Sequence, residues 1–335
     1  MRTEEEPGPP AEQGSIRDLL PAADRRHAID EIVEGLTAQR KRISSKYFYD
    51  AEGSRLFEEI TRLPEYYLTR TEKGLLEEVA VRLAPSIEGS SIVEIGSGDC
   101  SKISMILEAV PAGALPGIRY IPFDISRAAM EKASLKLTER FPGLEIQGLA
   151  GDFLRQLDMI PDGGRRLFCF LGSTVGNLSK GRAVRFFEDL GSIMEPGERL
   201  LLGVDTVKER KVLELAYNDG RGVTAEFNRN ILRVVNRIAG TDFEPEAFDH
   251  VAFYNDVDRR IEMHLRSREG CLVACPHLSG PILVEKDEMI HTENSHKFER
   301  EDVELFASAL RAEVTDVFED ERRRFALFLL TRIRG

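Results

Sequence analysis

The sequence of 335 residues contains no tryptophan and only four cysteines, Cys100, Cys169, Cys271 and Cys275. These cysteines lie in core-like segments or lack partner ligands, which indicates reduced thiols and argues against a structural zinc site. The longest apolar runs, such as 325–330, are far shorter than the roughly 20 residues that span a bilayer. The N-terminal MRTEEEPGPP lacks the apolar stretch of a signal peptide. We therefore expect a cytoplasmic protein without a membrane partner.

Positive charge is also in the minority. Lys and Arg number 46 against 58 Asp and Glu, which gives a formal net charge of −12. This charge opposes sequence-independent attraction to nucleic acid, so we expect no nucleic-acid partner. We also expect a monomer with a small-molecule substrate, a choice that the charge agrees with but does not make. Hydrophobic residues make up 42% of the chain, enough for a large core in two domains or in one domain with a large insertion.

The order of predicted elements indicates an α/β protein. Residues 1–14 are rich in Glu, Pro and Gly and predict a disordered tail. Apolar residues at helical spacing then predict three N-terminal helices, over 26–44, 54–60 and 71–83. Short apolar runs that alternate with amphipathic stretches predict five buried parallel strands with crossover helices. These strands are expected at 91–95, 120–123, 145–149, 167–171 and 200–204, and the helices at 101–109, 128–140 and 180–193.

The C-terminal part completes the predicted sheet. Two β-like runs, 313–318 and 325–331, flank a turn-prone segment and predict an antiparallel hairpin, which makes a seven-stranded sheet. Residues 207–296 are too many for a loop and predict an inserted subdomain that packs with the N-terminal helices. We therefore expect two parts, which we describe by residue range: a discontinuous substrate-binding domain from 15–70 and 207–296, and a sheet domain from 71–206 and 297–335.

The strongest local motif follows the first predicted strand. After Glu94 and Ile95, the sequence Gly96-Ser97-Gly98 leads directly into a helix, so that the backbone can approach a ligand at the helix N-terminus. A dinucleotide fingerprint would have another glycine at position 101, where Ser101 stands, which argues against a nicotinamide cofactor. On its own the motif is weak, because it also describes a tight turn without a ligand.

Residues at the ends of the next two strands strengthen this interpretation. Asp124 could accept hydrogen bonds from ribose hydroxyls, or cap the helix at Arg127. Asp152 could accept from an adenine amino group and Phe153 could stack on the base, or the pair could be a cap beside a core ring. Three such features at consecutive strand ends, with a terminal hairpin, predict the fold of class I S-adenosylmethionine (SAM)-dependent methyltransferases rather than of dehydrogenases.

Longer segments carry a specific resemblance that covers nearly the whole chain after about Asp24. The sequences at 46–60, 63–67, 170–177, 216–228 and 290–298 resemble those of the ergothioneine-pathway histidine Nα-methyltransferases. The resemblance implies that SAM is the cofactor and that the α-amine of L-histidine is methylated three times to give hercynine, the first step of ergothioneine biosynthesis. It implies no metal.

The resemblance also implies roles for individual residues, while the catalytic group stays unknown. The residues implied to hold SAM are Gly96, Gly98, Lys102, Asp124, Asp152 and Phe153. The residues implied to hold or adjoin the backbone groups of the amino acid are Tyr66, Asn177 and Tyr217, with Tyr49, Phe57 and Gly172 nearby; Tyr49, Tyr66 and Asn177 would position the reacting groups. The residues implied to read the imidazole are Glu293 and Ser295, with Met263 beside the ring.

The chemistry is consistent with these residue types. Methyl transfer from a sulfonium to nitrogen needs a neutral amine, alignment and a dry pocket, but no metal. Glu293 and Ser295 are two residues apart, so in an extended segment they share a face, where a carboxylate and a hydroxyl can satisfy a neutral imidazole. From these two residues alone a solvated turn is the alternative. Met263 is by default a core residue, and a pocket wall is the alternative.

Other assignments also have structural alternatives. Only one ring of the pair Tyr66 and Tyr67 can face a given pocket in an extended segment, and the family pattern favours Tyr66. Asn177 could be a helix cap, and Lys102 could be a charge on a helix surface. The six histidines, His291 and His296 among them, show no metal-ligand spacing, so we expect these two to be structural or peripheral.

Two other functions remain open at this point. One is N-methylation of another amino acid such as tryptophan, although an acidic side chain suits an indole ring less well. The other is SAM binding without catalysis, because no residue is identified as a general base.

Overall fold

A computed structural model describes residues 15–19 and 23–334, so the tail predicted at 1–14 lies outside the described residues. The described α-helices are α1 (Ala23–Thr37), α2 (Ala51–Ile60), α3 (Tyr67–Ile87), α4 (Ser101–Glu108), α5 (Arg127–Arg140), α6 (Lys180–Ile193), α7 (Arg210–Tyr217), α8 (Val223–Ala239) and α9 (Arg300–Leu310). Short 3-10 helices are η1 (Ser45–Phe48), η2 (Ala112–Gly117), η3 (Leu157–Met159), η4 (Thr174–Asn177) and η5 (Pro245–Ala247).

The described strands form one large sheet, one small sheet and a two-stranded ribbon. The large sheet contains β1 (Ser15–Asp18), β2 (Ser91–Ile95), β3 (Arg119–Asp124), β4 (Glu145–Ala150), β5 (Arg166–Phe170), β6 (Arg199–Asp205), β12 (Ala312–Glu319) and β13 (Phe325–Arg332). The small sheet contains β7 (Phe248–Asn255), β8 (Arg260–Ser267) and β11 (Met289–His296), and the ribbon contains β9 (Cys271–Val273) and β10 (Ile282–Val284).

The large sheet has the strand order β1-β4-β3-β2-β5-β6-β13-β12. Its first six strands in this order run parallel, whereas β13 is antiparallel to β6 and to β12. The α/β fold with the terminal antiparallel hairpin is therefore confirmed. The eighth strand, β1, was not predicted. It lies in the range assigned to the substrate-binding part, yet it pairs with β4 at the edge of the sheet.

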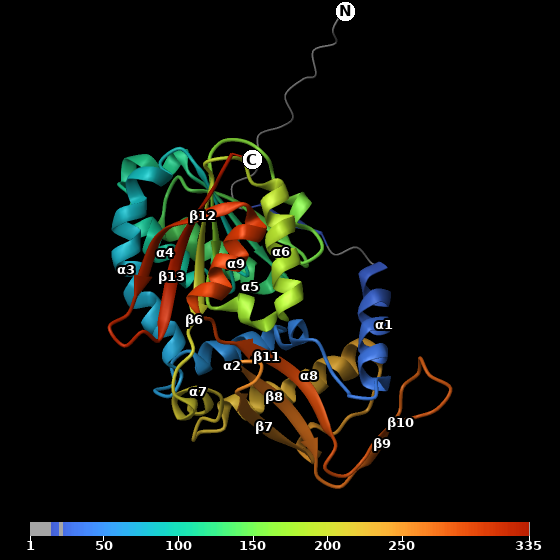
Figure 1. The fold of residues 1–335 in the computed structure, drawn as a ribbon. Coiled ribbons are helices and arrows are strands. Elements are labelled where there is room, and N and C mark those ends of the chain that lie inside the picture. The colour runs from blue at the N-terminus through green and yellow to red at the C-terminus, as the bar shows by residue number, and fades with distance from the viewer. Residues whose placement is uncertain (1–14, 20–22, 335) are drawn as a thin grey trace, which may run out of the picture.

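Helices cover both faces of this sheet (Figure 1). Residues of α3, α4 and α5 pack on one face together with Ile92 and Leu167, and residues of α6 and α9 pack on the other face with Val93 and Phe168. Successive residues of β2 and β5 thus enter two different cores, and every residue of both strands is buried. This burial explains why the parallel strands read as continuous apolar runs.

The N-terminal helices differ from their predicted limits. The first ends at Thr37 rather than near residue 44, because the chain turns back and the Arg42 amide donates to the carbonyl of Gly35 at 3.0 Å. The second starts at Ala51, where the Asp50 carboxylate caps the helix by accepting from the Gly53 amide at 2.8 Å. The third is longer than predicted and extends over 67–87.

A second layer lies at the end of the sheet where the parallel strands have their carboxyl ends, and we call residues 23–66 and 207–297 of this layer the cap (Figure 1). In the cap, the small sheet β11-β8-β7 packs against α8 in a core that also takes residues from α1 and α2. The chain leaves the large sheet at Thr206 and returns at Phe298, and these two residues form a β-bridge. No helix of the described segments is long and apolar enough to cross a membrane.

Candidate functional site

The glycine loop after β2 has the backbone conformation that the motif predicts. Gly96 and Gly98 have φ angles of +70° and +53°, which glycine adopts without strain. No described heavy atom beyond the neighbouring residues lies within 4 Å of where a Cβ of Gly98 would stand. The hydroxyl of Ser97 is buried and has no hydrogen-bond partner in the part of the chain that the structure describes. This loop therefore offers open backbone and an unsatisfied polar group to a ligand.

Two acidic residues lie next to the loop, and one of them, Asp124, bonds to it. One carboxylate oxygen of Asp124 accepts from the Gly98 amide and the other from the Ser126 amide, both at 2.9 Å, and burial raises the pKa of this group. Asp124 thus joins the ends of β2 and β3, and its remaining lone pairs can accept from ribose hydroxyls. Glu94 is buried, and burial raises its pKa to about 8, while Tyr120 donates a hydrogen bond to it.

The residues after β4 lie at the same edge of the sheet. Asp152 accepts from the Leu154 amide at 3.1 Å and lies 3.5 Å from the ammonium of Lys46. The partly exposed ring of Phe153 makes edge contacts with Phe170 and other core rings, and its Cε1 is 4.0 Å from where a Cβ of Gly96 would stand. Phe153 therefore belongs to the core edge and also borders the glycine loop.

Lys102 is not a free surface charge. Its ammonium forms an ion pair of 2.9 Å with Glu72, a residue of α3 that is only 1% exposed. The other carboxylate oxygen of Glu72 accepts from the Gly172 amide at 2.6 Å. Sequence reasoning missed Glu72, because nothing in the pattern of α3 indicates that one glutamate of this charged helix turns inward.

In the cap, the predicted imidazole-reading residues share one face of the small sheet. Glu293 pairs with Met263 across β11 and β8, Ser295 pairs with Ile261, and a bulge precedes Glu293. Burial raises the pKa of Glu293 to about 7, although the ammonium of Lys297 opposes this shift. Glu293 is surrounded by protein but keeps some accessible surface, and no described residue donates a hydrogen bond to its carboxylate.

Aromatic rings adjoin this carboxylate. Phe57 lies edge-on to Tyr49 and Tyr66, with centroid distances of 5.9 and 6.2 Å, and Tyr66 lies 6.3 Å from Tyr217. Burial raises the pKa of all three tyrosines, and the negative charge of Glu293 adds to each shift. The predicted substrate residues of the cap therefore form one cluster.

Tyr66 and Tyr67 separate as expected. The hydroxyl of Tyr67 donates to the buried carboxylate of Asp205 at 2.8 Å, on the sheet side, whereas Tyr66 joins the aromatic cluster. Asn177 ends η4, next to β11, and its side-chain amide has no hydrogen-bond partner among the described residues. It does not cap α6, whose N-cap residue is Ser179.

A buried charged network, which the sequence did not indicate, lies behind this cluster. The ammonium of Lys297 is 2.9 Å from Asp205, and both side chains are 0% exposed. Lys208 also forms an ion pair with Asp205. Burial alone would raise the pKa of Asp205, but the two ammonium groups hold it below its ordinary value.

The two histidines of β11 are not in this cluster of contacts. The ring of His291 lies 2.9 Å from the amide oxygen of Asn294. Burial lowers the pKa of both rings, that of His296 to about 4. Over residues 15–19 and 23–334, no group of three or more His, Cys, Asp or Glu side chains could hold a metal ion.

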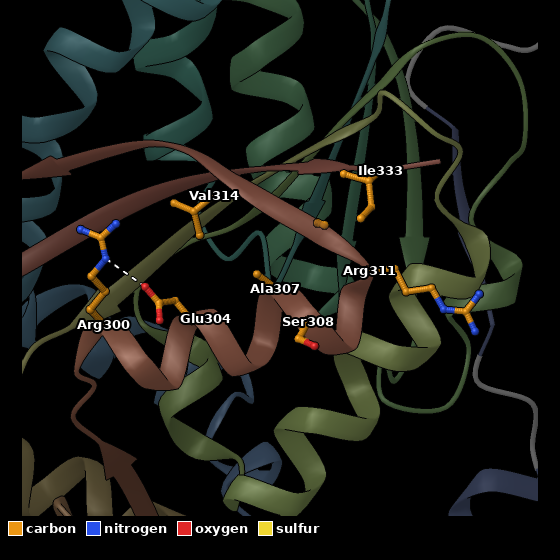
Figure 2. A pocket seen from close by; sticks show the side chains of 8 residues that line it. Arg300, Glu304, Ala307, Ser308, Arg311, Val314 and Ile333 are labelled. Atoms are coloured by element: carbon orange, nitrogen blue, oxygen red, sulfur yellow. Dashed lines mark hydrogen bonds and ion pairs between the residues drawn. The ribbon is translucent and has the colours of Figure 1, made fainter. Parts of the chain in front are cut away.

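A separate groove of about 580 Å³ lies between α9 and β12, on the sheet side of the molecule (Figure 2). Arg300, Glu304, Arg311 and Ile333 line it, with an ion pair of 3.1 Å between Arg300 and Glu304. It contains none of the predicted site residues. The chemistry-bearing groups gather instead where the cap meets the carboxyl ends of β2 to β6.

A sheet with this strand order, a glycine loop after its first central strand and acidic residues on the next two strands define a class I SAM-dependent methyltransferase. Residues 28–332 match the model of the family described as "Histidine-specific methyltransferase, SAM-dependent", and the chain belongs to this family.

Individual relatives cover most of the chain. The chain is 41% identical to a histidine N-alpha-methyltransferase of Mycolicibacterium smegmatis, over 95% of this chain and 99% of the relative. It is 42% identical to a protein of the same name from Mycobacterium tuberculosis, over 84% and 88%. A 4-dimethylallyltryptophan N-methyltransferase of Epichloe festucae var. lolii is 26% identical over 90% and 94%.

Proposed function

We propose that this protein methylates the α-amino nitrogen of L-histidine three times with SAM and releases hercynine, as the first step of ergothioneine biosynthesis. Besides family membership, one observation carries the proposal. Glu293 is a half-buried carboxylate, largely enclosed by protein, with a pKa of about 7 and no hydrogen-bond partner among the described residues, beside Met263 and two residues from Ser295. Such a group costs free energy unless a ligand donates to it, and an imidazole N–H is a suitable donor.

The cofactor end of the proposed site fits SAM. When bound, SAM supplies an electrophilic methyl group on its sulfonium. Gly96 turns the chain at a φ of +70°, Gly98 leaves open space beside its backbone, and Asp124 has lone pairs left for ribose hydroxyls. Asp152 and Phe153 would hold the adenine, and Lys102, fixed by Glu72, would hold the carboxylate of the methionine portion.

The amino-acid end would be held by neutral polar groups. Tyr66, Asn177 and Tyr217 would bind the α-carboxylate and the α-amine, next to Tyr49, Phe57 and Gly172. The amide of Asn177 is available because no described residue bonds to it. Hydroxyl and amide groups fix the head of the substrate without an ion pair to its nitrogen, so that the amine can turn as methyl groups accumulate.

The ring would be read by Glu293 and Ser295, with Met263 as the wall beside it. Met263 is 1% exposed and lies opposite Glu293 in the sheet register, which suits contact with the flat ring. The ionised carboxylate accepts from one ring nitrogen, and the hydroxyl of Ser295 can donate to the other. Ring recognition matters most for the later transfers, because the substituted nitrogen has lost its hydrogen-bond donors.

Rate enhancement in this proposal comes from alignment in a water-poor site rather than from an identified general base. Tyr49, Tyr66 and Asn177 are the positioning groups next to the amine. The three tyrosines of the cluster stay protonated near neutral pH, since burial raises the pKa of each. Tyr49 and Tyr66 can therefore donate hydrogen bonds to the substrate, whereas the Tyr217 hydroxyl donates to Ser295 Oγ at 2.7 Å and offers the substrate only its oxygen.

The direct test incubates the purified protein with SAM and L-histidine and follows the mass of the amino acid. We expect mono-, di- and trimethylated histidine in sequence, and no methylated product at saturating substrate would refute the proposal. The variant Glu293→Ala should lose histidine turnover by about 100-fold or more, as expected when a buried hydrogen bond to a charged group is removed. Its affinity for S-adenosylhomocysteine should be unchanged, and equal losses in both would contradict the role of Glu293.

The main alternative is methylation of another amino acid such as tryptophan. One relative is named as a tryptophan-derivative N-methyltransferase, although its identity is much lower. Competition between histidine and tryptophan in one reaction separates the two, and we expect product from histidine alone. Methyl transfer to either amine excludes SAM binding without catalysis. We further propose that the protein is a cytoplasmic monomer, which light scattering checks for the oligomeric state.

A further inference from the structure

Lys297 is a buried cation directly behind the proposed ring-reading site. Its side chain is 0% exposed and its ammonium lies 2.9 Å from Asp205, 2.7 Å from the hydroxyl of Ser295 and 3.4 Å from that of Tyr217. The ammonium also lies 5.1 Å from the centre of the Tyr217 ring. Its three N–H donors therefore have three oxygen partners, and it is fixed in place.

The contacts of Ser295 restrict the direction of its hydroxyl proton. An ammonium group can only donate, so Ser295 Oγ accepts from Lys297. The Tyr217 hydroxyl donates to the same oxygen at 2.7 Å, and its own oxygen accepts from Lys297 at 3.4 Å. A serine hydroxyl has two acceptor positions and one proton. With both acceptor positions filled, the proton is left for a third partner.

The face of the strand gives the direction of that partner. Glu293, Ser295 and Lys297 alternate along β11 and the residue after it, so their side chains leave the backbone on one side. Glu293 offers only an acceptor when it is ionised, and Ser295 offers only a donor in the arrangement described above. The two groups together match a ring with one N–H and one proton-free nitrogen.

We propose that Lys297 is a positioning residue that fixes Ser295 as a hydrogen-bond donor and thereby makes the site select substrates whose ring carries a proton-free nitrogen. This inference rests on the proposed function, because it assumes that Glu293 and Ser295 face the ring of the amino acid. Lys297 itself does not touch the substrate. Asp205, the last residue of β6, holds Lys297 in place. The direction in which the Ser295 hydroxyl donates its proton therefore depends indirectly on the position of this strand end.

The test measures selectivity rather than activity alone. Histidine is compared with the two pyrrolylalanine isomers, which keep a ring N–H but have no proton-free nitrogen. In the wild-type protein we expect kcat/KM for histidine to exceed that of the better isomer by about 10- to 100-fold, because the analogue leaves the buried Ser295 proton unpaired. In Lys297→Met the hydroxyl can turn toward Tyr217, so we expect this ratio to fall to within about threefold.

Two further variants separate positioning from stability. Lys208→Met removes the other ammonium that contacts Asp205 but does not touch Ser295, so its ratio should equal that of the wild type. The double variant Lys297→Met with Asp205→Asn removes the buried pair together and should give the same low ratio if the single variant does not fold.

Each outcome has one meaning. The positioning role is overturned if both Lys297 variants keep the wild-type ratio of kcat/KM for histidine to that for the better isomer. It is also overturned if this ratio falls equally in the Lys208 control. A wild-type protein that methylates neither histidine nor the analogues refutes the proposed function instead. A wild-type protein that methylates histidine and the better isomer equally well overturns the inference and leaves the proposed function intact.

Discussion

The substitution Glu293→Gln should stabilise the ligand-free protein while it destroys histidine recognition. Glutamine keeps the size of the side chain but removes the charge that burial disfavours. The pKa of Glu293 is raised from its ordinary value of 4.5 to about 7. One pKa unit corresponds to about 1.36 kcal/mol. Because solvent reaches part of the carboxylate and screens its charge, we expect ionisation of Glu293 to lower the free energy of unfolding by about 2–3 kcal/mol.

Because folding raises the pKa of Glu293, the stability difference between variant and wild type should grow with pH. A carboxyl group whose pKa is raised by folding is neutral in both states below about pH 4.5, where it costs nothing. The cost grows as the unfolded chain ionises and is complete above about pH 7. We therefore expect the free energy of unfolding of the variant to exceed that of the wild type by less than about 1 kcal/mol near pH 5 and by about 2–3 kcal/mol near pH 8.5.

The assay is the thermal midpoint of ligand-free wild type and variant at the two pH values. An unfolding entropy of about 2.1 cal/mol/K per residue converts the expected difference near pH 8.5 into a rise of about 3–4 °C. The control is Glu139→Gln, which neutralises an exposed glutamate of α5 that forms no ion pair with a described residue and should change neither midpoint. Equal differences at both pH values would refute the assignment of a largely enclosed carboxylate at position 293 that has no partner among the described residues.

Three other substitutions follow from the contacts. Glu72→Gln should weaken binding of S-adenosylhomocysteine about tenfold in calorimetry, since Lys102 loses its ion partner, and an unchanged affinity would contradict this. Asn177→Ala should raise KM for histidine about tenfold or more without changing cofactor affinity, and a shift of cofactor affinity instead would reassign the residue. Gly53→Ala should destabilise the protein by about 3 kcal/mol or more, because the Cβ would stand 1.6 Å from a carbonyl oxygen. Gly74→Ala is the control: no described atom lies within 4 Å of its Cβ position, so it should be neutral or stabilising. Equal melting temperatures for the two variants would refute the close approach at Gly53.

The sequence was most informative where burial and backbone geometry leave a local pattern. The five parallel strands were predicted to within one residue at each end because both of their faces are buried, and Gly96 and Gly98 were recognisable because a tight turn requires them. β1 left no such pattern. It has four residues, mostly exposed, and only Ile16 is apolar, since an edge strand needs little more than backbone pairing.

The charged network could not be predicted because its members are far apart in the chain. Asp205 and Lys297 are separated by a segment of about ninety residues, and only the folded sheet and cap place them together. The inward turn of Glu72 depends in the same way on Lys102 and Gly172, which belong to other elements. Local patterns describe a residue and its neighbours, whereas a buried charge is stable only with a distant partner.

The bridge between Thr206 and Phe298 has a consequence for how such proteins can diversify. The amide of Val207 donates to the carbonyl of Phe298 at 3.2 Å, and the amide of Phe298 donates to the carbonyl of Asp205 at 2.9 Å. The insertion therefore starts and ends at one point of the backbone. Because the ends already meet, its length and sequence can change without moving a strand of the large sheet. One sheet that binds the methyl donor can thus carry different inserted modules for different methyl acceptors, each joined to the sheet at this single bridge.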